Sequence, residues 1–173
     1  NRMIDKTLIQ TNFLQGKINL FSLQHQVIYE SSFRIFKDNK IFGIGTKMFR
    51  EICKEEKYIV KTELDHSING CQTSPHNYYL QLLTETGIIG AIPFIILFFF
   101  IIFIFIKQTY YVFFSKKKYV SDLQICLYIA LFISVWPLVP TGNFFNNYIS
   151  IFHFLPIGFL IFSYDKKKYI SNL

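Results

Sequence analysis

The sequence predicts an all-α, polytopic membrane protein fragment with about three transmembrane helices and one periplasmic loop containing short helices. Of the 173 residues, 51% are hydrophobic, and 21 Phe and 11 Tyr are among them. These residues form long uncharged blocks, whereas a soluble domain spaces its apolar residues periodically. Lysine triplets directly follow two of the blocks. Composition and charge placement together indicate helices that cross a lipid bilayer.

Three apolar segments are expected to span the membrane. Residues 88–106 carry no charge, and as a helix they are about 28 Å long, close to the roughly 30 Å hydrocarbon core. Residues 123–139 form the second expected span, and residues 148–164 form the third, which is on the short side. Pro93 and Pro156 fall inside two of these spans, where neighbouring groups can satisfy the carbonyl that a proline frees.

The lysine triplets orient the spans. Short loops rich in Lys and Arg stay on the cytoplasmic side of a membrane. Lys116–Lys118 follow the first span and Lys166–Lys168 follow the third, so both are expected inside. The uncharged connection 140–147 and the polar segment 50–75 are then expected outside.

This topology divides the chain into a periplasmic or interfacial region, residues 1–87, and a transmembrane region, residues 88–173. Within the first region, residues 23–37 have the spacing of an amphipathic helix. Residues 38–40 interrupt that pattern, and residues 41–45 contain two glycines that permit unusual backbone angles. The first residue is Asn rather than Met, which we interpret as a missing upstream part.

The cysteines fall in two different environments. Cys126 lies inside an apolar block and is expected to be a packing residue. Cys53 and Cys71 lie in the polar segment, which the topology places in an oxidising compartment where they could form a disulfide. Such a bond would contribute about 2–4 kcal/mol to stability. Two unrelated thiols are the alternative.

The histidines show no metal-ligand spacing, so no metal and no cofactor are expected. A P-loop is also missing from the sequence, which disfavours soluble nucleotide donors. The basic residues lie at the ends of apolar runs rather than across a polar face, which disfavours nucleic-acid binding. His66 is expected to be exposed in the polar loop. His153, inside the third span, is either a functional residue or a hydrogen-bonded interfacial residue.

The polar loop meets the first span at a histidine. A helix is expected to start near Pro75, which puts His76 close to its N-terminus at the outer membrane–water interface. An imidazole there can act as a general base near neutral pH. Gln81 and Glu85 are four residues apart and are expected to share a face of the helix. The alternative is that His76 and Asn77 only cap the helix.

This stretch resembles the signature of the O-antigen ligase and Wzy-type O-antigen polymerase family. That signature is a His followed by Asn, Ser or Gln, then nine variable residues, then Gly-x-x-Gly entering a membrane helix. In this chain His76 and Asn77 precede nine residues that end before Gly87, and Gly90 completes the motif.

An upstream segment also resembles the family, so the resemblance covers roughly residues 25–106. Residues 38–45 correspond to its "dxP–hydrophobic–hydrophobic–G-x-G" stretch, with Lys40 in place of the usual Pro. Gly43 and Gly45 supply the two glycines. Together with the later Gly-x-x-Gly pair they are expected to be helix-packing glycines.

The resemblance implies a metal-independent glycosyltransferase, of which this chain is the C-terminal catalytic half. Such enzymes lie in the bacterial inner (cytoplasmic) membrane with the active site on the periplasmic face. They take a glycan from an undecaprenyl-diphosphate carrier and pass it to lipid A core, to another glycan repeat or to a protein.

By this analogy His76 would deprotonate the acceptor hydroxyl. Arg50 and then Arg34 would hold the donor diphosphate, because a guanidinium fork suits phosphate oxygens. The alternative for each arginine is a solvated side chain or a contact to a lipid headgroup. The expected supporting residues are Asn77, Gln81, Glu85 and His25.

Two departures from the family pattern limit the interpretation. Residues 91–93 lack the Thr and second His that often follow in ligases, so a ligase is not favoured over a polymerase. His25 stands four residues before Tyr29, where the family commonly has Arg. Either this branch differs, or a donor contact comes from upstream of the chain.

A transporter or flippase segment is the first rival, because the kinked spans and His153 could form a pathway. A transporter, however, places polar residues at mid-membrane on several spans, whereas this chain concentrates them at the outer interface. A subunit that only anchors a partner is the second rival. It gives no reason for the spacing of His76–Gly90.

Overall fold

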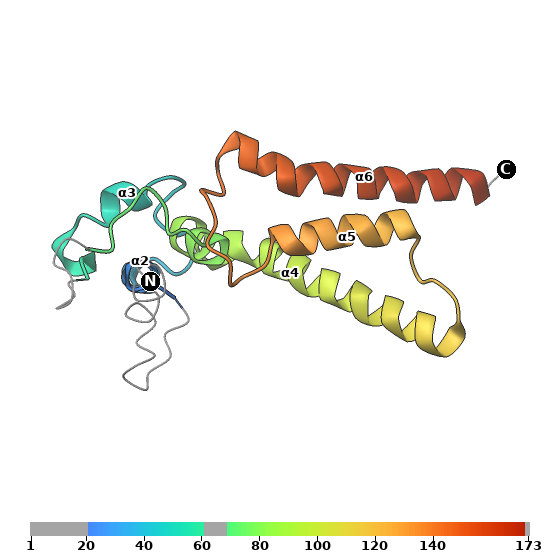
Figure 1. Ribbon diagram of the computed structural model, residues 1–173. Helices are drawn as coiled ribbons and strands as arrows, with labels where there is room; N and C mark the ends of the chain where they lie inside the picture. Colours follow the sequence, from blue (N-terminus) through green and yellow to red (C-terminus); the bar gives the residue numbers. More distant parts are fainter. Residues whose placement is uncertain (1–20, 61–68, 172–173) are drawn as a thin grey trace, which may run out of the picture.

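The computed structural model describes residues 21–60 and 69–171 (Figure 1). His66 lies outside the described residues. Within those two ranges every regular element is helical, which confirms the all-α class. The elements are, in chain order, α2 (Leu23–Asp38), α3 (Phe49–Ile52), the 3₁₀ helix η2 (Glu56–Tyr58), α4 (Tyr78–Ser115), α5 (Asp122–Ser134) and α6 (Asn147–Ser171).

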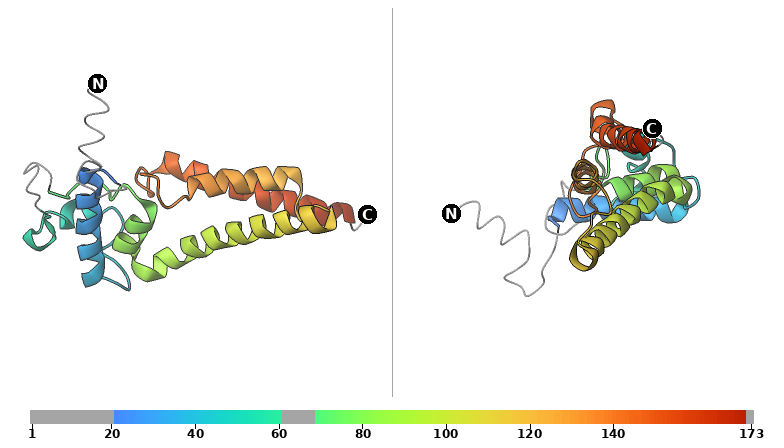
Figure 2. Two further views of the ribbon diagram at one scale, coloured as in Figure 1. Left: turned by 60° about the horizontal axis from the view of Figure 1, so that its bottom comes forward. Right: turned by 90° about the vertical axis from the view of Figure 1, so that its right-hand side faces the viewer.

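The molecule has two parts that differ in the direction of their helices. The long part of α4, α5 and α6 lie side by side along one direction. In contrast, α2 and the first turns of α4 run across one end of these helices (Figure 2). We call residues 21–60 and 69–86 the cap, and residues 88–171 the membrane bundle.

The helix α2 confirms the expected amphipathic segment. Its buried face turns toward the other elements of the cap, and a cluster around Ile35 and Phe49 packs α2 against α3. The hydroxyl of Thr84 in α4 donates to the carbonyl of Ser32, 3.2 Å away. The buried residues of α2 are Val27, Ile28, Ser31, Ser32 and Ile35.

Two helices are long and apolar enough to cross a membrane, Tyr78–Ser115 and Asn147–Asp165. The part of α4 that follows Gly87 continues past residue 106, where the apolar run ends, and is about 42 Å long. Large apolar side chains remain exposed along its outer faces, as lipid-facing helices require.

The helix α5 corrects the expectation of a span over residues 123–139. It has 13 residues and is about 20 Å long, short of the roughly 30 Å hydrocarbon core. It ends at Ser134, ahead of Pro137 and Pro140, because the residue before a proline is disfavoured in the α region. The chain therefore leaves the helix early and forms a loop over residues 135–146.

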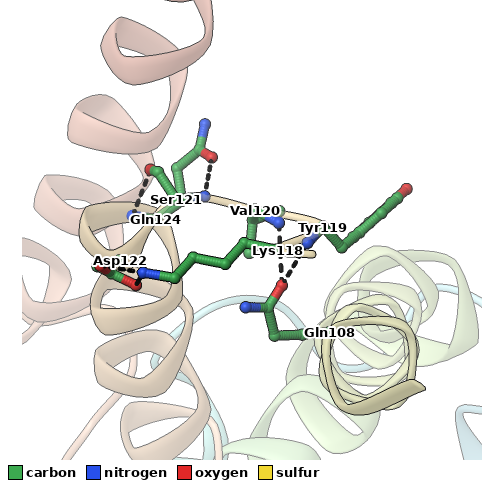
Figure 3. Close-up of polar contacts among 7 residues, drawn as sticks. All are labelled: Gln108, Lys118, Tyr119, Val120, Ser121, Asp122 and Gln124. Atoms are coloured by element: carbon green, nitrogen blue, oxygen red, sulfur yellow. Dashed lines mark hydrogen bonds and ion pairs between the residues drawn. The ribbon is translucent and has the colours of Figure 1, made fainter. Parts of the chain in front are cut away.

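The turn between α4 and α5 is closed by side chains (Figure 3). The Oε1 atom of Gln108 accepts the N–H groups of Tyr119 and Val120 at 2.9 and 3.0 Å. Ser121 and Gln124 then form a capping box that starts α5. This turn carries residues 116–118, and it lies at the same end of the bundle as the C-terminal turns of α6, opposite the cap.

Candidate functional site

A break in α4 at Gly87 turns the chain from the cap into the membrane bundle. Gly87 has φ 67° and ψ −169° inside an otherwise helical segment, a backbone conformation that essentially only glycine adopts. A Cβ added to Gly87 would lie 2.1 Å from the carbonyl oxygen of Ile41. A Cβ added to Gly43, which has φ 66°, would lie 2.6 Å from the amide nitrogen of Gly87. The two glycines thus allow two backbones to touch.

Backbone hydrogen bonds from the neighbouring segment satisfy the groups that this break leaves unpaired. An interrupted helix leaves carbonyls before the break and N–H groups after it without partners. The N–H groups of residues 44–45 donate to the carbonyls of residues 84–85 at 3.0 and 2.9 Å. The N–H groups of residues 88–89 donate to the carbonyls of residues 40–41 at 2.8 and 3.4 Å. We call this set of contacts the glycine junction.

The other two motif glycines do not bring the two backbones together, but Gly45 has φ 99°, a conformation in which any other residue would be strained. A Cβ on Gly45 would approach only the side chain of Met48, at 3.3 Å. A Cβ on Gly90 would meet Thr86, a residue of its own helix, rather than a second helix.

The start of α4 differs from the expectation. The helix begins at Tyr78, and Asn77 is its N-cap, whose Oδ1 accepts the N–H groups of Tyr79 and Leu80 at 3.0 and 3.1 Å. The Nδ2 atom of Asn77 donates to the carbonyl of Pro137 at 2.6 Å. His76 therefore precedes the helix instead of lying on its first turn.

His76 is held between α2 and the loop that follows α5. It has φ 54°, and its carbonyl accepts the N–H of Thr141 at 2.8 Å. Its Nδ1 lies 3.3 Å from the carbonyl oxygen of Thr141. Because a carbonyl can only accept, Nδ1 donates in this contact, which in the neutral ring leaves the lone pair on Nε2. The residue is half-buried.

His25 is the side chain of α2 that flanks this imidazole. The two ring centroids are 6.2 Å apart. Burial, and then the charge of His76, lower the pKa of His25 below its ordinary value. The Nδ1 of His25 also lies 2.7 Å from the hydroxyl of Ser22. A neutral imidazole is thus favoured beside His76.

A polar network centred on the buried Gln81 and Glu85 joins the first turns of α4 to their neighbours. The Nε2 of Gln81 donates to Glu85 and to Asn143, both at 3.0 Å, and its Oε1 accepts the N–H of Phe144 at 2.9 Å. Glu85 in turn accepts the N–H of Phe49 at 3.2 Å. Gln81 and Glu85 are 0% and 1% exposed. The network fixes α3 and the loop after α5 to the same turns of α4.

Arg50 follows Phe49 directly, so the same network positions its backbone. Its side chain is 63% exposed and lies 3.5 Å from the carboxylate of Glu51. The guanidinium therefore keeps most of its donors available to a ligand.

Arg34 is the second arginine candidate. It pairs with Glu30, and its Nη1 is 3.5 Å from the carbonyl of Ile59. Arg34 follows His25 by nine residues on α2, which is about 13 Å along the axis and half a turn around it. The described contacts thus bring His25, and not Arg34, to His76.

The two cysteines of the polar segment are joined. Cys53 and Cys71 form a disulfide with a Cα–Cα distance of 5.2 Å. This bond ties the chain that leads to His76 to the end of α3. Cys126, expected to be a packing residue, is free and exposed on α5.

Two site residues were missed by the sequence interpretation, Thr141 and Asn143. Both belong to the uncharged connection after α5, which was identified only as an outer loop. Its placement outside, beside the start of the first span, was the one signal that could have pointed to them. Among the described residues no group of three or more His, Cys, Asp or Glu side chains is placed to hold a metal ion.

The comparisons with known proteins bear on the cap. Residues 22–95 match the family model described as O-antigen ligase. That segment contains α2, both sides of the glycine junction and His76. No curated protein and no solved structure matches the chain. Residues 22–95, less than half of the chain, are thus similar to the O-antigen ligase family, which supports a role in O-antigen or polysaccharide biosynthesis.

Proposed function

We propose that this chain is the catalytic part of a glycosyltransferase that transfers or polymerises glycan from an undecaprenyl-diphosphate carrier. The acceptor is another glycan or lipid A core, and the reaction needs no metal. It takes place on the periplasmic face of the bacterial inner membrane. The observation that supports this proposal most directly is the position of His76. This residue is half-buried at the cap end of the bundle, and its Nδ1 contacts the carbonyl of Thr141.

His76 would act as the general base. The acceptor hydroxyl oxygen attacks the anomeric carbon, its proton passes to Nε2 of His76, and the bond from that carbon to the diphosphate oxygen breaks. The diphosphate leaves with the electron pair and stays on the polyprenyl chain. The contact from Nδ1 to Thr141 supports this role, because it orients the ring and leaves Nε2 free to accept a proton.

The charge that develops on the leaving diphosphate calls for a cation. Arg50 is the better candidate, because its guanidinium is largely exposed and its segment is fixed by Glu85. Arg34 is already paired with Glu30 and lies about 13 Å along α2 from His25. A guanidinium suits this task because it binds phosphate oxygens in pairs and stays charged.

The distribution of buried polar groups favours group transfer over transport. A transport pathway requires polar groups at mid-membrane on several helices. In the described residues the buried polar side chains gather in the cap. They are Ser31, Ser32, Ser74, Asn77, Gln81, Thr84 and Glu85, against Gln124 and His153 in the bundle.

Replacement of His76 by Ala in the full-length protein tests the proposal. We expect the surface polysaccharide ladder on a gel to lose its long products, by at least about a hundredfold, because general-base catalysis contributes that much or more. His66→Ala is the control, since the sequence places His66 in the same outer loop without a catalytic role. A normal ladder from His76→Ala at normal membrane levels would rule out the catalytic imidazole.

A further inference from the structure

Two large apolar side chains of the loop after α2 are exposed where the chain enters the membrane bundle. Ile41 is 59% exposed and Phe42 is 76% exposed. The backbone of the same loop contacts Gly87 at the glycine junction. A group of exposed apolar side chains marks a contact with a membrane or with another protein. The loop is therefore a candidate surface for one of these two partners.

Backbone hydrogen bonds place this loop at the level of the first turn of the bundle. The N–H groups of residues 88–89 donate to the carbonyls of residues 40–41 at 2.8 and 3.4 Å. The uncharged run 88–106, as a helix of about 28 Å, matches the roughly 30 Å hydrocarbon core. The start of that run thus marks the outer edge of the core, and Ile41 and Phe42 lie at the same edge.

The lipid-facing surface of α4 adjoins the loop. Ile88, Ile89 and Ile92 in the first turns of the bundle are exposed. Since backbone hydrogen bonds join the two segments, these side chains and those of Ile41 and Phe42 belong to neighbouring parts of one apolar surface. Exposed apolar residues on a membrane helix face lipid. The loop therefore extends a surface that faces lipid.

Two lysines adjoin the apolar residues of the loop. Lys37 and Lys40 are exposed and line a hollow of about 440 Å³, whose wall also includes Ile41 and Phe42. Because α2 runs across the end of the bundle (Figure 2), Lys37 in its last turn stays near the same membrane surface. Segments that bind the interface of an anionic membrane have this composition, since their ammonium groups contact headgroup phosphates while their apolar side chains enter the hydrocarbon.

The charge of the segment favours lipid over a transmembrane helix as the occupant. A helix packed on this surface would separate the ammonium groups from water and headgroups, which is unfavourable unless carboxylates pair with them. Asp38 is the single acidic residue of segment 37–47. Its carboxylate accepts the hydroxyl of Tyr58 at 2.8 Å and lies 3.8 Å from Lys57. Phospholipid headgroups supply the anions that the lysines require.

We propose that the loop after α2 anchors the cap in the membrane by binding an anionic phospholipid. Ile41 and Phe42 enter the leaflet on the side of the cap, and Lys37 and Lys40 bind the lipid phosphate in the hollow that they line. The anchor holds the glycine junction, and with it the start of the bundle, at a fixed depth. It does not depend on the proposed function.

Site-specific photo-crosslinking tests the anchor. The full-length protein with p-benzoylphenylalanine in place of Phe42 is put in nanodiscs of equal amounts of phosphatidylethanolamine and phosphatidylglycerol, and mass spectrometry identifies the adducts. We expect phospholipid adducts, with phosphatidylglycerol exceeding phosphatidylethanolamine at least about fivefold, the contribution of one lysine at an anionic surface. The same replacement of Lys57 is the control and should give no lipid adduct, because η2 lies on the side of α2 away from the bundle (Figure 1).

Two pairs of lysine substitutions provide matched variants. Lys37→Gln with Lys40→Gln should bring the two lipid adducts to about equal amounts, while the total yield stays high because the apolar side chains remain. Lys116→Gln with Lys117→Gln removes the same charge at the opposite end of the bundle. This second pair should leave the preference for phosphatidylglycerol unchanged.

Adducts between position 42 and a protein segment would show that a helix covers the loop, and would overturn the proposal. Absence of any adduct would show that the loop faces water, with the same consequence. Equal labelling by the two phospholipids in the protein with all its lysines would refute the phosphate site. Crosslinking needs no turnover, so these outcomes are independent of the polysaccharide ladder of His76→Ala.

Discussion

The cap and the membrane bundle are stabilised by different kinds of interaction. The cap buries polar side chains, and four of them make hydrogen bonds to other elements: Asn77, Gln81, Thr84 and Glu85. The bundle packs aromatic rings and aliphatic side chains instead, such as Phe98 stacked on Phe132 with centroids 5.8 Å apart. Directional contacts fix one geometry, whereas apolar contacts tolerate exchange among residues of similar volume. In the cap, substitutions at a few positions should therefore cause most of the loss of stability. In the bundle, the loss should be spread over many positions.

The largest expected effect comes from Gly87→Ala, which breaks the boundary between the two regions. The new Cβ would overlap the Ile41 carbonyl in a backbone conformation closed to alanine. Strain and overlap together should destabilise the cap by more than about 3 kcal/mol. We expect rapid proteolysis of the cap and loss of the polysaccharide ladder, while the bundle stays in the membrane.

Gly158→Ala is the matched control in the bundle. Its added Cβ meets nothing within 4 Å, and alanine favours a helix over glycine by roughly 1 kcal/mol. The protease resistance of the cap should stay as in the unmodified protein. Equal resistance of the Gly87→Ala cap would contradict the glycine junction.

Loss of the disulfide should have the next largest effect. Reduction, or Cys53→Ser with Cys71→Ser, should lower the stability of the cap by about 2–4 kcal/mol, because the open chain gains entropy when unfolded. We expect faster cleavage of the cap by protease, and a mobility shift on reduction in a gel. Cys126→Ser, at the free exposed thiol of α5, should change neither. A cap equally resistant with and without the bond would show that hydrogen bonds alone hold it.

The difference between the cap and the membrane bundle also explains which features the sequence could predict. Patterns within one element were sufficient for α2, for the spacing of Gln81 and Glu85, and for the two glycine motifs. The contact between the two motifs followed from neither, since it depends on the positive φ at Gly43 and Gly87 that brings their backbones together. In the bundle, hydropathy located the apolar segments.

Hydropathy did not locate the helix ends or the long-range partners. An apolar run does not show that α5 ends at Ser134, because backbone restrictions at the following prolines decide that. Thr141 and Asn143 reach the site from 65 and 62 residues away in sequence. The placement of His76 before α4 depends on Asn77 as the cap. Such contacts arise from tertiary packing, so no local pattern contains them.

The smallest expected effect is a pH dependence of the cap's stability. Burial, and then the charge of His76, lower the pKa of His25 below its ordinary 6.5. The unfolded cap therefore binds a proton at a higher pH than the folded cap does. Stability is fully present above about pH 6.5 and is lost as the pH falls through the folded pKa.

Protease resistance of the cap, measured from about pH 7 to about pH 5, should therefore fall modestly, and His25→Gln should flatten that slope. His76→Gln should remove only part of it, because burial is the larger cause of the lowered pKa. Carboxylates that titrate in the same window act equally in both variants, so the difference between the slopes belongs to His25. An unchanged slope in His25→Gln would mean that this imidazole is as easily protonated in the folded cap as in water, and that the two rings do not influence each other.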